Sequence, residues 1–197
     1  MLKRTFDIIL SIVGIIILSP IFIVVTILIK SESKGPAFFK QLRVGKNGKE
    51  FYIFKFRSMA KNQDKKDLKI TVANDKRITK IGSFIRKYKI DELPQLINVV
   101  KSEMSIVGPR PEVPEYVKYY SIRDRKIILS VKPGITDLAS IEFRNESQIL
   151  AESPNPEKSY IKIILPKKLK YCRFYVKNRS FTYDIMIILK TFKAIII

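Results

Sequence analysis

The longest apolar segment of the chain lies near its N-terminus. Residues 8–29 contain no charged side chain, and as a helix they would measure roughly 33 Å, about one hydrocarbon thickness. The pattern fits a spanning helix, a helical hairpin that enters one leaflet and returns, or a cleaved signal peptide. Cleavage is the least favoured, because the segment exceeds a normal signal core and no A-x-A-like site follows it.

Two features of this segment bear on the choice between a span and a hairpin. Lys3 and Arg4 precede it and further lysines follow it, so the charge bias places both ends on the cytoplasmic side. Ser19-Pro20 near the centre predicts a sharp bend, because proline removes a backbone hydrogen bond and clashes with the preceding turn. Proline kinks also occur in spanning helices, so the residues alone leave these two alternatives even.

Two aromatic and β-branched runs follow the apolar segment. Residues 38–59 carry them around the sequence GKNG at 45–48, and Asn-Gly is a strong signal for a β-hairpin. The alternating Phe and Tyr side chains indicate one buried face, and stacking on nucleic-acid bases is the less favoured alternative. The same hairpin carries Arg43, Lys55 and Arg57, which could line a phosphate site.

The middle of the chain predicts a loop and two helices. Residues 60–76 are polar and charged, typical of a surface loop. A short basic helix follows, in which Arg86 is best suited to bind two phosphate oxygens at once. The next helix is expected to begin with Asp91 as N-cap and Pro94 in its first turn. Its apolar face would consist of Leu93, Leu96, Ile97 and Val100.

Asp91 and Glu92 are the candidate catalytic pair. Neighbouring side chains of a helix diverge, so the two carboxyl groups cannot share one proton. This favours a division in which one carboxylate attacks and the other holds a metal, and nearby cations would lower the pKa of Asp91. Arg110 lies between two prolines that fix its backbone. We predict that Arg110 and Pro111 form a phosphate-binding element beside the pair.

Composition narrows the chemistry. Lys and Arg number 38 against 18 Asp and Glu, and the net charge of +20 favours polyanionic partners such as anionic lipids, phosphorylated substrates or nucleic acid. The absence of histidine means that any metal site must use carboxylates. The single cysteine, Cys172, excludes a disulfide framework and is best explained as a buried apolar filler.

The C-terminal part carries weaker patterns. Residues 116–131 predict a basic helix that ends at Lys132-Pro133-Gly134, and residues 135–150 are too mixed to assign. Residues 181–197 are apolar with charges interspersed. Docking of this tail at a membrane interface is only slightly favoured over ordinary core packing.

Several motifs recur together in one order along the chain. They are Lys3-Arg4-x-Phe6-Asp7, Ser19-Pro20, KQLRVGKNGKEFYIFKFRSM, RITKIGSFIRK, DELPQLINVVKSEMSIVGPRPE and VKPGIT. Together they resemble the bacterial sugar transferase family, the small monotopic phosphoglycosyl transferases, over roughly residues 2–145. The resemblance implies an N-terminal re-entrant helix broken at Ser19 and Pro20, which decides the even choice in favour of the hairpin.

The resemblance also implies a mechanism. In this family a UDP-sugar usually gives its sugar phosphate to undecaprenyl phosphate and releases UMP. Asp91 would be the nucleophile that forms a covalent phosphosugar intermediate, and Glu92 would bind Mg²⁺. Cations and Mg²⁺ suit the charge of a transferring phosphoryl group, and an ionised acceptor phosphate requires no general base. The expected substrate-binding residues are Arg57, Arg86, Arg110, Pro111 and Arg144.

The chain departs from the family pattern after VKPGIT. Where members often continue with Gly, then AQ and later NGRN, this chain has Asp137-Leu138-Ala139-Ser140 and then Glu142-Phe143-Arg144-Asn145. If this segment holds the nucleotide or sugar, its altered chemistry bears on the identity of the donor and not on the reaction.

We therefore expect an α+β protein with a re-entrant membrane helix in residues 1–31 and a catalytic domain in residues 32–197. It would act at the cytoplasmic face of the bacterial inner membrane, on a UDP-sugar, undecaprenyl phosphate and the phospholipid surface, and would start a surface glycan. The main alternative is a membrane-tethered nucleic-acid-binding protein, and a third is a non-catalytic scaffold. An Asp-Glu pair among so many cations favours the enzyme, without a nucleic-acid partner.

Overall fold

The computed structural model describes residues 2–60, 72, 75 and 77–196, and it confirms a mixed α and β fold. Most of the predicted loop at residues 60–76 lies outside this range. The helices are α1 (Leu2–Glu32), α2 (Lys80–Lys87), α3 (Gln95–Val100), α4 (Pro114–Val117), α5 (Ile122–Ile128), α6 (Leu138–Glu142), α7 (Glu146–Ala151), α8 (Pro156–Ser159), α9 (Leu165–Asn178) and α10 (Phe181–Ile196). The strands are β1 (Phe38–Val44), β2 (Glu50–Phe56), β3 (Ser105–Val107) and β4 (Gly134–Thr136). Single turns form η1 (Lys46–Gly48), η2 (Ile90–Glu92) and η3 (Tyr160–Ile164).

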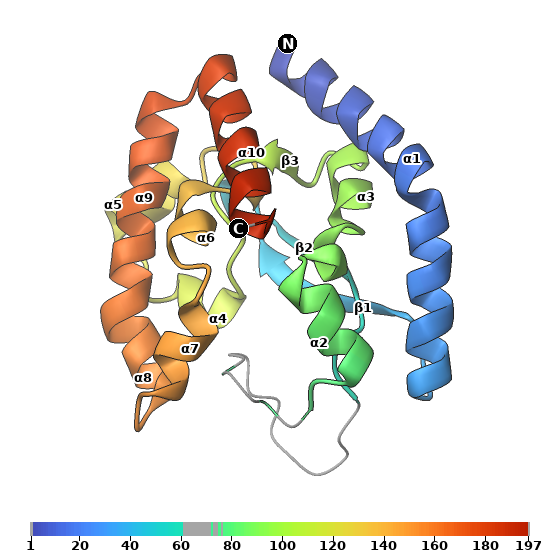
Figure 1. The fold of residues 1–197 in the computed structure, drawn as a ribbon. Coiled ribbons are helices and arrows are strands. Elements are labelled where there is room, and N and C mark those ends of the chain that lie inside the picture. Colours follow the sequence, from blue (N-terminus) through green and yellow to red (C-terminus); the bar gives the residue numbers. More distant parts are fainter. Residues whose placement is uncertain (1, 61–71, 73–74, 76, 197) are drawn as a thin grey trace.

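Helix α1 lies along one side of the molecule, and α9 and α10 lie on the other, with α3 and the β1–β2 hairpin between them (Figure 1). The helix is long and apolar enough to cross a membrane by length and composition. Many of its large apolar side chains are exposed, among them Ile16 at 66% and Ile17 at 68%. An apolar surface that the protein itself leaves uncovered is compatible with membrane association.

The helix continues through the predicted break at Ser19-Pro20, so no turn between two helices forms there. Helix α1 runs through both residues, and it bends along its length in Figure 1. Pro20 has no N–H to donate to the carbonyl of Ile16, four residues earlier. The Ser19 hydroxyl donates to that carbonyl instead, at 2.8 Å. A side chain that replaces the missing hydrogen bond explains why the helix continues.

The first turns of α1 are fixed to the rest of the protein by polar side chains. Arg4 donates to the carbonyl of Val99 and to the hydroxyl of Ser102, both at 2.6 Å. These contacts place a positive charge at the C-terminal end of α3, where the helix dipole favours a cation. Asp7 accepts a hydrogen bond from the hydroxyl of Ser105 at 2.7 Å. The basic and acidic residues before the apolar segment therefore attach α1 to α3 and β3.

Helix α10 packs into the core through one face. Asp184 pairs with Lys3 and accepts a hydrogen bond from the Tyr175 hydroxyl at 2.7 Å, and Ile187 is fully buried. For this tail, membrane docking was slightly favoured over core packing, but the inner face of α10 packs into the core. Leu189 and other apolar side chains remain exposed on α10, and docking of that outer face on a membrane stays a prediction.

The predicted β-hairpin is confirmed. Strands β1 and β2 pair antiparallel over their whole length, from Phe38 opposite Phe56 to Val44 opposite Glu50. Asn47 and Gly48 adopt left-handed backbone conformations at the turn, which Asn and Gly tolerate best. Phe51 and Ile53 are buried and Tyr52, between them, is exposed on the other face, so the alternation marks one buried face, as predicted.

Helix α3 lies between α1 and the hairpin, and its buried face differs from the predicted one. Val100 is exposed, and the buried residues of α3 are Gln95, Asn98 and Val99. The side-chain amide of Asn98 accepts from the backbone N–H of Phe54 at 3.0 Å and donates to the carbonyl of Tyr52 at 2.8 Å. Apolar periodicity missed this face because a hydrogen-bonded polar residue occupies its centre.

Two short parallel strands bring the GPRP segment and the start of α6 together. Strand β3 pairs with β4, and each leads directly into one of these segments. The chains cross closely here, since a Cβ on Gly134 would lie 2.1 Å from the backbone nitrogen of Gly108. Only glycine permits this approach. The crossing places Arg110 beside Asp137.

Candidate functional site

Asp91 and Glu92 lie in the turn η2 between α2 and α3. Lys89 has a left-handed backbone that ends α2. Pro94 and not Asp91 is the N-cap of α3, so the predicted cap is wrong. Because its carboxylate is not used for capping, Asp91 remains available to a ligand. Asp91 and Glu92 are 6% and 9% exposed, so the pair occupies a shielded position.

The Glu92 carboxylate is held by two cations. One guanidinium nitrogen of Arg110 donates a hydrogen bond to Oε2 at 3.0 Å, and another donates to Oε1. The Lys55 ammonium donates to Oε1 at 2.9 Å. Burial raises the pKa of Glu92, but Arg110 and Lys55 outweigh it and hold the pKa well below its usual range. In return Glu92 raises the pKa of Arg110. Glu92 is therefore ionised at neutral pH.

The Asp91 carboxylate has a different environment. Among the residues that the structure describes, it makes no hydrogen bond or ion pair. Burial and the charge of Glu92 raise its pKa, and Lys55, Arg86 and Lys89 oppose that shift without cancelling it. The predicted lowering by nearby cations is thus outweighed. Two adjacent carboxyl groups with such different surroundings are suited to different roles.

The structure brings most of the predicted site residues together. Arg86 lies close enough to influence Asp91 electrostatically, and it reaches Ser58 at 3.5 Å. Arg110 contacts Glu92, and the carbonyl of Pro111 accepts a hydrogen bond from Arg43 at 2.9 Å. A cation-rich site around a carboxylate with no ion pair among the described residues can bind a phosphoryl group and stabilise its charge.

Two predicted substrate-binding arginines lie elsewhere. Arg57 donates to the carbonyls of Ser33 and Lys34 at 2.7 and 2.8 Å, just beyond the end of α1. Arg144 reaches the carbonyl of Ala194 near the end of α10 at 3.4 Å. Both guanidinium groups are therefore engaged with the backbone of apolar helices, and the prediction that they bind substrate is not supported by these contacts.

Replacing Arg57 by Ala tests this reassignment. We expect a loss of about 1–3 kcal/mol in stability, because charged hydrogen bonds to the end of α1 are removed. The Michaelis constant for a nucleotide-sugar donor should stay within about twofold of the parent. Thermal melting and donor titration measure the two effects, with Arg144→Ala as the exposed-arginine control. A large rise in the donor constant with unchanged melting would restore Arg57 to the site.

Lys55 and Asp137 belong to the site but were not predicted as site residues. Lys55 was named only as one of three cations of the hairpin, and its ion pair with Glu92 depends on how the hairpin packs against η2, which local sequence patterns do not give. Asp137 is 1% exposed, and its Oδ2 accepts from the backbone N–H of Arg110 at 3.2 Å. Its Oδ1 caps α6 by accepting from the N–H of Ser140 at 2.7 Å. The sequence signal for Asp137 was that the chain departs from the family pattern at this position.

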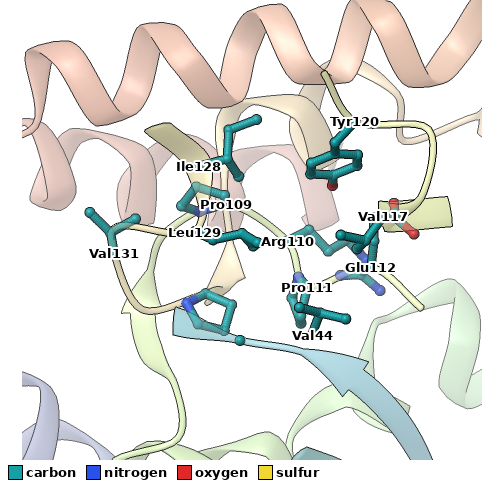
Figure 2. Close-up of a pocket in the computed structure, with 12 residues that line it drawn as sticks. Val44, Pro109, Arg110, Pro111, Glu112, Val117, Tyr120, Ile128, Leu129 and Val131 are labelled. Atoms are coloured by element: carbon teal, nitrogen blue, oxygen red, sulfur yellow. The ribbon is translucent and has the colours of Figure 1, made fainter. Parts of the chain in front are cut away.

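A small cavity lies behind the arginine. Figure 2 shows that its wall includes Pro109, Arg110 and Pro111, with Val44 on one side and Leu129 on the other. Its volume of about 10 Å³ leaves room for about one water molecule. The cavity is too small for a nucleotide sugar, and the packing around it holds the segment in place.

The residues present fit a magnesium ion shared with a substrate. No cluster of three or more His, Cys, Asp or Glu side chains occurs within the described part of the chain. Magnesium is commonly held by one or two carboxylates together with substrate phosphates. Glu92, with its ionised carboxylate, would supply the protein ligand.

These features define a membrane-compatible α+β protein with a cation-rich site built on an acidic pair. The chain belongs to the bacterial sugar transferase family, whose model matches residues 1–197.

Several curated proteins are similar over nearly the whole chain. The UDP-N-acetylgalactosamine-undecaprenyl-phosphate N-acetylgalactosaminephosphotransferase of Aeromonas hydrophila is 36% identical over 99% of this chain and 44% of its own length. The UDP-glucose:undecaprenyl-phosphate glucose-1-phosphate transferase of Klebsiella pneumoniae is 37% identical over 98% and 40%. The exopolysaccharide production protein ExoY of Sinorhizobium fredii is 33% identical over 98% and 84%. The chain thus spans less than half the length of the first two.

Proposed function

We propose that this protein transfers a sugar-1-phosphate from a UDP-sugar to undecaprenyl phosphate, releases UMP and so starts the assembly of a surface glycan. The observation that carries the proposal is the Asp91 carboxylate, which makes no ion pair within the described part of the chain, beside a Glu92 that two cations hold ionised. The relatives named as undecaprenyl-phosphate sugar phosphotransferases support the substrate class.

The reaction proceeds in two displacements at one phosphorus atom. An Asp91 oxygen attacks the phosphorus that carries the sugar, the bond to the UMP oxygen breaks, and UMP leaves with the electron pair. An ionised oxygen of undecaprenyl phosphate then attacks the same phosphorus, and the bond to Asp91 breaks. The acceptor enters already ionised, so no histidine or other general base is needed.

The surrounding cations supply most of the rate acceleration. Negative charge spreads over the phosphoryl oxygens in the transition state, where Arg86, Arg110 and Lys55 stabilise it. When bound at Glu92, Mg²⁺ neutralises diphosphate charge and orients the leaving group. The low exposure of the acidic pair strengthens these interactions, because less water screens them.

The proposed location is supported by the apolar helix. Helix α1 would insert from the cytoplasmic side of the bacterial inner membrane and return to it, with phospholipid around its exposed apolar side chains. The curvature of α1 along its length (Figure 1) and Pro20 in its interior support a re-entrant path. The lipid-linked acceptor and the soluble donor would then meet beside Asp91.

An assay of UMP release tests the function. Purified protein is incubated with undecaprenyl phosphate, Mg²⁺ and a panel of UDP-sugars. With the acceptor present, we expect continued UMP release from at least one donor. Without the acceptor, UMP release should not exceed the amount of enzyme. Release from no donor contradicts the proposal. Salt-sensitive binding of DNA or RNA that ignores Asp91→Asn would instead favour a nucleic-acid-binding protein.

Cysteine labelling tests the path of α1. Cys172 is buried, so single cysteines introduced by Leu2→Cys and Lys34→Cys report with little background. Both positions are exposed at the two ends of α1. We expect a membrane-impermeant thiol reagent to label both from the cytoplasmic side of oriented membranes. Labelling of the two from opposite sides would show that the helix spans.

A further inference from the structure

Glu112 is a buried acid two residues after Arg110. It is 9% exposed and has no direct contact with Glu92. The Tyr160 hydroxyl donates a hydrogen bond to its Oε1, and Arg43 and Lys168 approach its carboxylate at 3.7 and 3.9 Å. A buried carboxylate held by a hydroxyl and two cations is confined to one position.

The hydroxyl comes from an irregular turn in the C-terminal half. Tyr160 begins the π-type turn η3, which precedes α9, and such turns are frequent at functional sites. Its ring packs against Tyr116 with centroids 4.9 Å apart, and the Lys168 ammonium lies 5.1 Å from the Tyr160 ring centroid. Lys168 also pairs with Glu146 at 2.6 Å. The turn therefore aims the Tyr160 hydroxyl at Glu112.

The arginine segment transmits the position of Glu112 to Arg110. Its backbone is held where Arg43 donates to the carbonyl of Pro111 at 2.9 Å and where the N–H of Val44 donates to the carbonyl of Glu112 at 2.9 Å. Pro111 fixes its own backbone and restricts the residue before it. A displacement at Glu112 is therefore passed on to Arg110 and is not absorbed between them.

We propose that Tyr160 and Glu112 are positioning residues for Arg110, so that the hydrogen bond between them sets how the guanidinium meets the donor diphosphate. This inference rests on the proposed function. It assigns a role in donor binding to the turn before α9. The sequence analysis had assigned no function to this turn. Neither residue contacts the reacting atoms, and both act through the Pro109–Glu112 segment.

Tyr160→Phe tests the proposal, because it removes the hydroxyl and keeps the ring. We expect the Michaelis constant for the UDP-sugar to rise about tenfold, as a small misplacement of a substrate clamp is costly. The constant for undecaprenyl phosphate should stay within about twofold. Tyr116→Phe is the matched control: it removes a neighbouring hydroxyl that approaches Glu157 at 3.5 Å, and it should leave both constants unchanged.

A second variant guards against a simple folding defect. Glu112→Gln should raise the same donor constant, and the double variant should raise it no further than the larger single change, because both substitutions break one contact. A folding defect would lower the apparent kcat at unchanged Michaelis constants. That result, or a parental donor constant in Tyr160→Phe, overturns the positioning role while leaving the function intact. A parent enzyme that releases no UMP from any donor overturns the proposed function and this role with it.

Discussion

Replacing Asp91 by Asn is expected to reduce UMP release by at least about 10⁴-fold, the scale of losing a covalent nucleophile. The amide keeps the shape of the side chain and lacks the anionic oxygen that would attack phosphorus. No labelled phosphosugar should remain attached to the variant protein after denaturation, whereas the parent should retain it when undecaprenyl phosphate is withheld. Scintillation counting of gel-separated protein measures this directly.

The same substitution should preserve or raise stability. Burial and Glu92 raise the pKa of Asp91, so the folded state favours its protonated form. That contribution to stability is present at low pH and is lost as the pH rises through the raised pKa, so a neutral amide removes an unfavourable charge at pH 7. Asp124→Asn is the matched control, since it alters a buried aspartate paired with Arg173. Normal turnover by Asp91→Asn would refute the assigned nucleophile.

Glu92→Gln is expected to reduce turnover by about 10²–10³-fold and to destabilise the protein. The glutamine leaves Arg110 and Lys55 without their buried counter-charge, and breaking such a pair from one side costs about 3–5 kcal/mol. Higher Mg²⁺ concentrations should not restore the parental rate, because the proposed ligand is a charged carboxylate. Melting temperature and a magnesium titration of UMP release measure the two effects.

The pH dependence of stability separates the two carboxylates further. The pKa of Glu92 is held well below its usual range, so its contribution is present at neutral pH and is lost as the pH falls below about 4. The parent should lose more melting temperature on acidification than Glu92→Gln does. Asp91→Asn should show the parental acid profile in this range, apart from the small gain at neutral pH. Parental stability and magnesium response in Glu92→Gln would contradict the assignment of Glu92.

Local patterns predicted those features that depend on a few neighbouring residues. Alternating aromatic residues around Asn47-Gly48 gave the hairpin, and its register is fixed by that turn. The acidic pair and the proline-flanked Arg110 were recognised because their chemistry is visible in consecutive residues. A break at Ser19-Pro20 was predicted, but the helix is continuous there, and this continuity depends on the Ser19 hydroxyl and the Ile16 carbonyl.

Features that depend on distant contacts could not be predicted in this way. Arg57 resembles a phosphate ligand as much as Arg110 does, but strand β2 ends beside the last residues of α1 and directs it there. The raised pKa of Asp91 results from burial that only packing creates. Lys55 contacts Glu92 from 37 residues earlier in the chain, and Asp137 contacts Arg110 from 27 residues later.

By itself, the sequence determined the family, the apolar helix, the hairpin and the identity of the acidic pair and its arginine. These rest on periodicity and on residue types at short spacing, which local interactions are enough to specify. Only the tertiary structure decided that Arg110 and Lys55 bind Glu92 and form no hydrogen bond with Asp91. It also decided that the Tyr160 hydroxyl contacts Glu112 in the arginine segment. The physical reason is that burial and charge pairing depend on distances between residues far apart in the chain, which the fold sets.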